Sequence, residues 1–138
     1  MQNSQEGTIL STRNIHVPSA HDINSCSTVT EVLSRIGDKW SVQVVIGLRD
    51  RPRHFNELRR MIAGISQRML TRTLRGLERD GLVRRTVVHE GLLHVDYALT
   101  DLGRSLEEPV AALGMWAVRN RQSVIAAREK FDAASPQD

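Results

Sequence analysis

The sequence predicts a mainly α-helical fold with one small β-hairpin, the arrangement called a winged helix-turn-helix. Apolar residues at helical spacing indicate four helices between residues 28 and 80. A short turn at Gly64 separates the third helix from the fourth, and such a pair forms a helix-turn-helix motif. Two stretches rich in β-branched residues, 82–88 and 93–99, follow on either side of residues 89–92. They predict a β-hairpin that forms the wing.

The 138-residue chain has room for one compact domain, which we expect over residues 26–124. Residues 1–25 lack apolar periodicity and aromatic side chains, so they predict a flexible arm. Residues 125–138 are expected to hold the end of a C-terminal helix and a tail. No apolar run approaches the roughly 20 residues of a membrane span, and the N-terminal residues lack the pattern of a signal peptide. We therefore expect a cytoplasmic protein without membrane contact.

The first two predicted helices each have a polar start and an apolar stripe. Thr28 and Glu31 have the spacing of a capping box, and the helix that they begin ends at Gly37. Its stripe consists of Val29, Val32, Leu33 and Ile36. The second helix is expected to begin at the N-cap Asp38 and to end before the polar residues 49–52. Its inward side chains are expected to be Trp40, Val44, Val45 and Leu48.

The next two helices form the predicted helix-turn-helix. A short helix over residues 56–62 has an apolar face made by Phe55, Leu58 and Ile62. Ser66 is a favourable N-cap for a longer helix that runs to about Asp80, and Gly81 suits the position after its end. Beyond the hairpin, Thr100 can cap a further helix, and Pro109 is compatible with the first turn of a last helix. The apolar stripe of that last segment consists of Leu106, Val110, Leu113 and Ala117, with Trp116 beside it.

The helix over residues 66–80 separates two kinds of side chain. Its apolar side holds Leu70, Leu74 and Leu77, and its opposite side holds Arg68, Arg72, Arg75 and Arg79. Residues 49–85 contain eleven arginines and four acidic residues, a net charge of +7, although the whole chain carries only +3. Arginine binds phosphate and guanine edges through its planar fork, and a major groove admits one α-helix. The pattern favours DNA, and the alternative is an exposed helix that its arginines keep soluble.

Position along this helix predicts which residues contact DNA. The N-terminal half of a recognition helix usually reaches base edges, so we assign base contacts to Gln67, Arg68, Thr71 and Arg72. Arg75 and Arg79 are expected to contact phosphates, and Glu78 is an alternative ion-pair partner for either arginine. Further phosphate contacts are expected from Ser66, Arg53, Arg84, Arg85 and His94.

Several separated motifs occur along the chain in one order. They include Ile36-Gly37-Asp38-Lys39-Trp40, Phe55-Asn56-Glu57-Leu58-Arg59, Gly64-Ile65-Ser66-Gln67, Met69-Leu70-Thr71, Asp80-Gly81-Leu82-Val83 and Leu99-Thr100-Asp101-Leu102-Gly103. From Cys26 to about Val124 the chain resembles the HxlR family of bacterial regulators, relatives of the MarR type. The resemblance implies a winged helix-turn-helix homodimer that binds double-stranded DNA as a repressor or activator. A repressor on an inverted-repeat operator is our preferred interpretation.

In such proteins the terminal helices of two subunits pack together. The resemblance therefore implies a dimer interface formed by Val29, Val32, Leu33, Leu106, Val110, Leu113, Trp116 and Ala117. The sequence departs from the family pattern at two places. Leu92-Leu93-His94 stands where family members often have Pro-Pro-Arg, so this wing lacks that arginine. Cys26-Ser27 follows a long arm, whereas family members often begin close to a Cys-Pro pair.

Cys26 is the only cysteine of the chain, which excludes an intrachain disulfide framework and a cysteine-based zinc site. It stands at the start of the first predicted helix, where the helix dipole favours a reactive thiolate. Some family members sense oxidants through a cysteine near this place, so the resemblance makes Cys26 a candidate redox sensor. The other interpretation is a small buried apolar residue.

The sequence gives less support to two other classes of function, an enzyme and a protein-binding module. An enzyme finds no support, because His89 and His94 are five residues apart across a hairpin, whereas a zinc protease needs a spacing of four on a helix. His16, His21 and His54 show no spacing suited to a metal, so we predict no metal and no cofactor. A winged helix that binds only proteins would give no reason for the arginine row. A small molecule or an oxidant is expected as effector.

Overall fold

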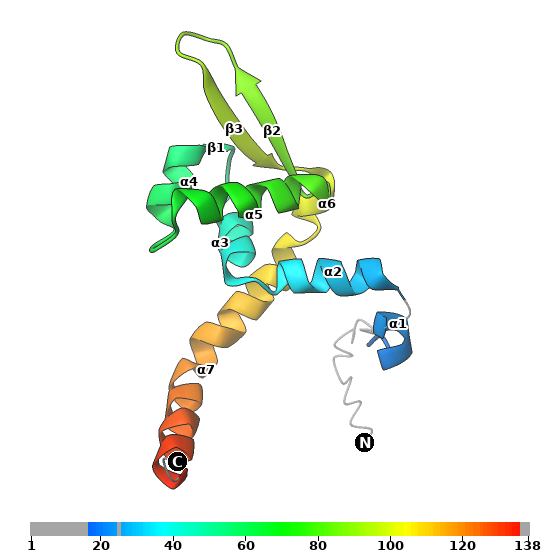
Figure 1. Ribbon diagram of the computed structural model, residues 1–138, viewed down its shortest axis with the longest axis vertical. Coiled ribbons are helices and arrows are strands. Elements are labelled where there is room, and N and C mark those ends of the chain that lie inside the picture. Colours follow the sequence, from blue (N-terminus) through cyan, green and yellow to red (C-terminus); the bar gives the residue numbers. More distant parts are fainter. Residues whose placement is uncertain (1–16, 25, 136–138) are drawn as a thin grey trace, which may run out of the picture.

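The computed structural model describes residues 17–24 and 26–135, and it confirms the mainly α-helical fold with a β-hairpin wing (Figure 1). Before the wing the elements are α1 (Ala20–Asn24), α2 (Ser27–Ile36), α3 (Lys39–Gly47), β1 (Arg53–His54), α4 (Phe55–Met61) and α5 (Gln67–Arg79). The wing consists of β2 (Val83–Val88) and β3 (His94–Leu99), and α6 (Asp101–Arg104) and α7 (Glu107–Ala134) follow. Residues 1–16 and 25 of the predicted arm lie outside the described residues.

The core lies where α3, α4 and α5 meet the base of the sheet. Its most buried side chains are Val44, Leu48, Leu58, Leu70, Leu74 and Leu77, all at most 1% exposed. Three of the expected N-caps are confirmed. Asp38 accepts hydrogen bonds from the backbone N–H groups of Trp40 and Ser41, while Ser66 and Thr100 cap α5 and α6 in the same way. These caps fix where each helix begins, because they satisfy N–H groups that have no partner within the helix.

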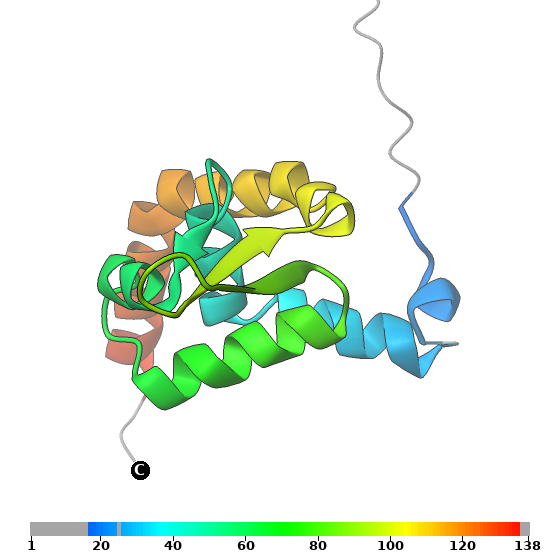
Figure 2. The ribbon, with the colours of Figure 1, turned by 90° about the horizontal axis from the view of Figure 1, so that it is seen from above.

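The sheet has three antiparallel strands in the order β1-β3-β2, and α5 lies along one side of it (Figure 2). Side chains alternate between the two faces of a strand, and directly paired residues share a face. Val83 pairs with Leu99 on the face that is buried in the core. Thr86, Asp96 and His54 are paired in a row on the opposite face.

Three local features differ from the sequence expectation. Residues 20–24 form the short helix α1 inside the expected arm, and Ser19 and Asp22 exchange the hydrogen bonds that begin it. Cys26, not Thr28, occupies the N-cap position of α2, so the expected capping box is wrong. Residues 53–54 form β1, which the sequence analysis missed because two residues show no periodicity.

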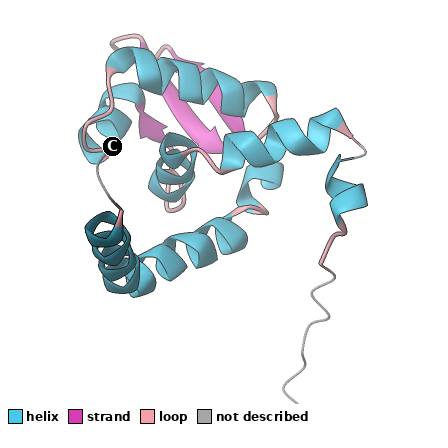
Figure 3. Cartoon of the chain, turned by 60° about the horizontal axis from the view of Figure 1, so that its bottom comes forward, coloured by secondary structure: helices cyan, strands magenta, loops and turns pink. Residues whose placement is uncertain are grey.

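Two helices extend away from the body of the fold. α2 points to one side, and the C-terminal part of α7 lies apart from the remaining helices (Figures 1 and 3). α7 packs mainly on α3 through its N-terminal part, where Val110 is buried. Among the described helices, none has both the length and the apolar character needed to cross a membrane.

Candidate nucleic-acid interface

α5 is held in place by its apolar face. Leu70, Leu74 and Leu77 are at most 1% exposed, as their spacing predicted. Ser66 fixes the start of the helix, because its hydroxyl accepts a hydrogen bond from the N–H of Met69 at 3.1 Å. Gly81 ends the helix with a positive φ of 75°, a conformation that glycine adopts without steric cost. The orientation of α5 on the body is therefore set at both ends and along one side.

The opposite side of α5 faces solvent. Its exposed residues are Gln67, Arg68, Thr71, Arg72, Arg75, Glu78 and Arg79. All of them except Glu78 are residues that the sequence analysis assigned to DNA contact. A shallow depression lies along the N-terminal part of this face, lined by Gln67, Arg68, Thr71, Arg72 and Arg75. The hydroxyl of Thr71 donates to the carbonyl oxygen of Gln67 at 2.9 Å, so it can still accept a hydrogen bond from a ligand.

The arginines of this face form no ion pairs with acidic side chains of the described residues. No ion pair between described residues joins Glu78 to Arg75 or Arg79, so the alternative partnership of Glu78 is not formed. Arg68 and Arg72 also form no ion pair within the described part of the chain. An unpaired arginine row attracts phosphate over several ångströms, because salt screens charges only beyond roughly 8 Å at physiological ionic strength.

Arg35 links α2 to the middle and the end of α5. Its guanidinium forms an ion pair with Asp80, the C-cap of α5. The guanidinium also crosses Gly76, where a Cβ atom would lie only 1.8 Å from Arg35 Nη1. The sequence analysis missed this contact. A glycine in a helix interior was the available signal, because it lowers helix stability and often marks a close approach.

The junction of β1 and α4 uses its arginines internally. Glu57 Oε2 lies 2.6 Å from Arg51 Nη2 and 3.5 Å from Arg53 Nη1. The hydrogen bond from Arg51 and the backbone N–H of His54 lower the pKa of Glu57 to about 2. Arg53 also donates to the carbonyl oxygen of Gly47, and its side chain is only 16% exposed. The expectation that Arg53 is available for a DNA phosphate is therefore corrected.

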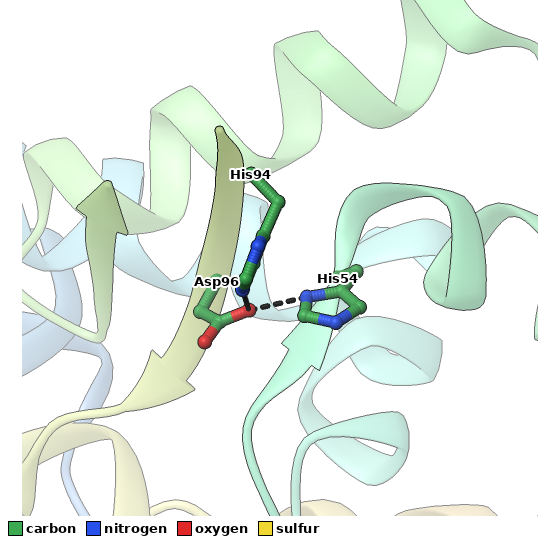
Figure 4. A group of neighbouring side chains, drawn as sticks. All are labelled: His54, His94 and Asp96. Carbon is green, nitrogen blue, oxygen red and sulfur yellow. Dashed lines mark ion pairs between the residues drawn. The ribbon is translucent and has the colours of Figure 1, made fainter. Parts of the chain in front are cut away.

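The wing presents its two arginines on opposite faces. Arg85 pairs with Tyr97 and lines a depression shared with Arg75 of α5, whereas Arg84 pairs with Ala98 on the other face. His94 was expected to contact a phosphate. Instead its ring turns toward Asp96 and His54, and Nε2 of His94 lies 3.7 Å from Oδ1 of Asp96 (Figure 4). Arg85 is thus the wing arginine that lies beside the arginine face of α5.

Comparisons with known proteins agree with this geometry. Residues 35–124 match the family model described as HxlR-like helix-turn-helix. The chain belongs to the HxlR family. It is 39% identical over 100 residues to YtfH of Escherichia coli, an HTH-type transcriptional regulator, covering 72% of this chain and 79% of YtfH. The structure of ytfH from Salmonella typhimurium superposes with a TM-score of 0.68 at 39% identity, covering 72% and 89% of the two chains.

A second solved structure, the redox regulator HypR in its reduced form, has a TM-score of 0.65 at 41% identity. The superposition covers 72% of this chain and 99% of HypR. Members of the HxlR family are transcriptional regulators, and the present protein is a DNA-binding regulator of the winged helix-turn-helix type. The family match begins at residue 35, so most of α2 precedes it.

Cys26 of this HxlR protein is an exposed free thiol at the N-cap position of α2. The backbone N–H groups of Val29 and Thr28 and the hydroxyl of Thr28 favour the thiolate, and they lower the pKa of the Cys26 thiol. The interpretation of Cys26 as a small buried apolar residue is therefore wrong. Whether the thiol responds to oxidants stays a prediction.

The residues expected at the dimer interface fall into three groups by burial. Val110 is only 2% exposed and belongs to the core, so its expected exposure is wrong. Leu106 and Val32 are half-buried. The remaining members are exposed: Val29, Leu33, Leu113, Trp116 and Ala117. This HxlR protein therefore offers an apolar surface on α2 and on α7 beyond Val110.

Proposed function

We propose that the protein acts as a homodimer that inserts the α5 helix of each subunit into the major groove of an inverted-repeat operator. The observation that carries the proposal is that α5 has a buried apolar side and an exposed side that carries arginines. Its leucines are at most 1% exposed, while every arginine of its outer face is exposed and free of ion pairs with described residues. A helix so divided can enter a groove without losing its contact with the body.

The residues of the outer face divide by their position along α5. Gln67, Arg68, Thr71 and Arg72 lie in the N-terminal half, and we assign them to base edges. Arg75, Arg79 and Arg85 are assigned to phosphates, because Arg75 and Arg85 line one depression between the helix and the wing. Ser66 and Arg84 are further phosphate contacts in this proposal: both are exposed, Ser66 at the start of α5 and Arg84 on the face of the wing opposite to Arg85.

The exposed apolar residues of α2 and α7 support the homodimer. Leu113 and Trp116 are 52% and 58% exposed on α7, and Leu33 is 49% exposed on α2. Apolar side chains grouped on projecting helices mark an interface more often than a solvated surface. A two-fold dimer of this kind requires half-sites about 10–10.5 base pairs apart, or a multiple of that spacing. Occupation of such an operator in the cytoplasm would favour repression.

Selection of duplexes from random DNA by the full chain tests the proposal. We expect the wild type to enrich an inverted repeat. The variant Arg68→Ala/Arg72→Ala should enrich no sequence while it retains weak binding to all DNA. The matched control Arg119→Ala/Arg128→Ala removes the same charge from α7 and should enrich the wild-type repeat, provided that sedimentation shows it to remain a dimer. Equal enrichment by both double variants would contradict the assignment of α5. The absence of salt-dependent DNA binding by the wild type would favour a protein-binding module.

A response to oxidants is a second candidate function, and it rests on the exposed Cys26 thiol with its lowered pKa. The similar protein HypR is described as a redox regulator. A disulfide between the Cys26 residues of two subunits would need their Cα atoms within about 7 Å, and a mixed disulfide with a small thiol would not. The test compares operator binding by the wild type and Cys26→Ser with and without diamide. An identical response of the two proteins would remove Cys26 from the mechanism.

A further inference from the structure

His54, His94 and Asp96 come together on the face of the sheet that points away from the core (Figure 4). His54 of β1 is paired directly with Asp96 of β3, and His94 precedes Asp96 by two residues on the same strand. Directly paired residues and residues two apart share a face of a sheet, so the three side chains converge. One nitrogen from each ring and one carboxylate oxygen all lie within 4.8 Å of one another. The geometry points to a binding site for a divalent transition-metal ion such as Zn²⁺ or Co²⁺.

The carboxylate of Asp96 places one oxygen at the centre of this group. Oδ1 is buried and is within ion-pair distance of His54 Nδ1 and, at 3.7 Å, of His94 Nε2, and no described residue donates a hydrogen bond of normal geometry to it. A buried carboxylate oxygen is costly unless a cation or a hydrogen-bond donor lies beside it, so the position between this oxygen and the two rings favours a bound cation. Two imidazoles and one carboxylate are ligands that zinc and related ions use in sites with open positions.

The surroundings of both histidines suit metal binding. His94 Nδ1 lies 3.2 Å from the carbonyl oxygen of Leu92. Because a carbonyl oxygen can only accept, this hydrogen bond puts the proton on Nδ1 and leaves the lone pair of Nε2 directed at Asp96. His54 directs Nδ1 at Asp96, and its Nε2 lies 4.0 Å from Glu57 Oε1. Histidine ligands of metals usually donate their second N–H to a carbonyl or a carboxylate, as His94 does here, and Glu57 lies on the corresponding side of His54.

Small side-chain shifts would complete the site. Ligand atoms bound at about 2.0–2.2 Å to a tetrahedral ion lie roughly 3.3 Å apart, and the three atoms are already within reach of that arrangement. The three residues leave one coordination position for water. An ion at this place would join β1, and with it the start of α4, to β3 of the wing. This assignment does not depend on the proposed recognition of DNA.

Metal binding can be measured with the full chain in a Cys26→Ser background, which removes the only thiol as a competing ligand. The protein is freed of metal with a chelator, carries no affinity tag and is titrated with Co²⁺ and then with Zn²⁺. We expect one Co²⁺ per chain with visible absorption bands, displacement of Co²⁺ by Zn²⁺, and a rise in Tm with Zn²⁺. Binding should weaken as the pH falls, because protonated imidazole cannot bind a metal.

Variants locate the ion. His94→Gln and Asp96→Asn should each lower the affinity for Zn²⁺ by about tenfold or more, since even partners outside the coordination sphere cost about 10–100-fold. The matched control His89→Gln, in the exposed turn of the same hairpin, should bind as the background protein does. Circular dichroism checks that each variant folds. Where a variant fails to fold, NMR of the background protein decides, because Zn²⁺ should shift the ring protons of His54 and His94 but not those of His89.

Two results would overturn the assignment. One is the absence of metal uptake by the folded background protein at millimolar metal, which would leave the group as an ion pair between imidazole and carboxylate. The other is uptake that His94→Gln and Asp96→Asn reduce no more than His89→Gln does. Operator binding by the metal-free protein is measured in parallel, so that loss of the metal site and loss of DNA recognition are distinguished.

Discussion

α5 and α7 expose opposite kinds of surface. α5 buries Leu70, Leu74 and Leu77 within one chain and exposes arginines. α7 is a helix of 28 residues in which Val110 is buried against the core, while exposed apolar side chains continue along its length. Leu113, Trp116, Val118 and Phe131 are between 52% and 70% exposed. The apolar face of α5 is thus complete in one subunit, and that of α7 is not.

The exposed side chains of the two helices indicate which kind of partner each helix requires. Charged side chains are stable in water, so α5 is well solvated until a polyanion approaches. Apolar side chains gathered on a projecting helix are not stabilised by water, so α7 needs another apolar surface. In the proposed homodimer, a second copy of the chain supplies such a surface through its own α2 and α7. We therefore expect three classes of substitution, which respectively unfold the chain, dissociate the proposed dimer or weaken DNA binding.

The largest effect is expected in the buried face of α5. Leu74→Ala should lower the free energy of unfolding by about 2–5 kcal/mol, because it leaves a cavity beneath the helix. The control Leu102→Ala removes the same atoms from a side chain that is 57% exposed, and it should change that free energy by about 0.5 kcal/mol or less. Urea unfolding monitored by circular dichroism measures both. Equal losses would show that α5 is not packed as described.

The next effect concerns the exposed face of α7. Trp116→Asp should dissociate the dimer, since buried tryptophans at interfaces contribute about 2 kcal/mol or more, while the helical content of the chain is retained. The control Leu92→Asp places the same charge on a side chain that is 90% exposed in the wing turn. Sedimentation velocity at micromolar concentration should show a monomer for the first variant and a dimer for the second. A dimeric Trp116→Asp protein would remove this part of α7 from the interface.

The third effect is confined to DNA recognition. Arg72→Ala should weaken binding to the selected operator by about 1–3 kcal/mol and should reduce discrimination against base changes at one position of each half-site. The dimer should remain intact, because Arg72 lies on the exposed face of α5 and not on α7. Fluorescence anisotropy with the operator and with single-base variants of it measures both properties. Unchanged base discrimination would move the contact with bases to other residues.

The sequence predicted most of the fold because the relevant signals are local. The caps at Asp38, Ser66 and Thr100 and the leucine spacing of α5 lie within single helices. β1 gave no such signal, because its two residues become a strand only by pairing with Tyr97 and Asp96 of β3. The same distant pairing joins His54 to His94 and Asp96, which spacing along the chain could not reveal.

The arginines of the candidate site also show what sequence alone cannot predict. In the sequence, Arg53 and Arg72 are both cations of the same basic segment. The structure separates them, because Glu57 and the carbonyl oxygen of Gly47 hold Arg53 in the body, whereas Arg72 has no acidic partner among the described residues. Only the neighbours that folding supplies decide which cation remains available to a ligand.

The smallest effect is expected at the C-terminal end of α5. Arg79 is exposed, forms no ion pair with a described residue and lies furthest from the N-terminal half that is assigned to base edges. Arg79→Ala should therefore weaken specific and random DNA by the same factor, and it should reduce the slope of log affinity against log salt by about one. Arg119→Ala removes an equal charge from α7 and should leave the slope unchanged, because α7 faces the second subunit and not DNA in the proposed homodimer. Titrations at four salt concentrations give the slopes. A drop in the slope for Arg119→Ala would contradict the assignment of α7 to protein contact. A loss of base preference for Arg79→Ala would contradict the assignment of Arg79 to phosphate.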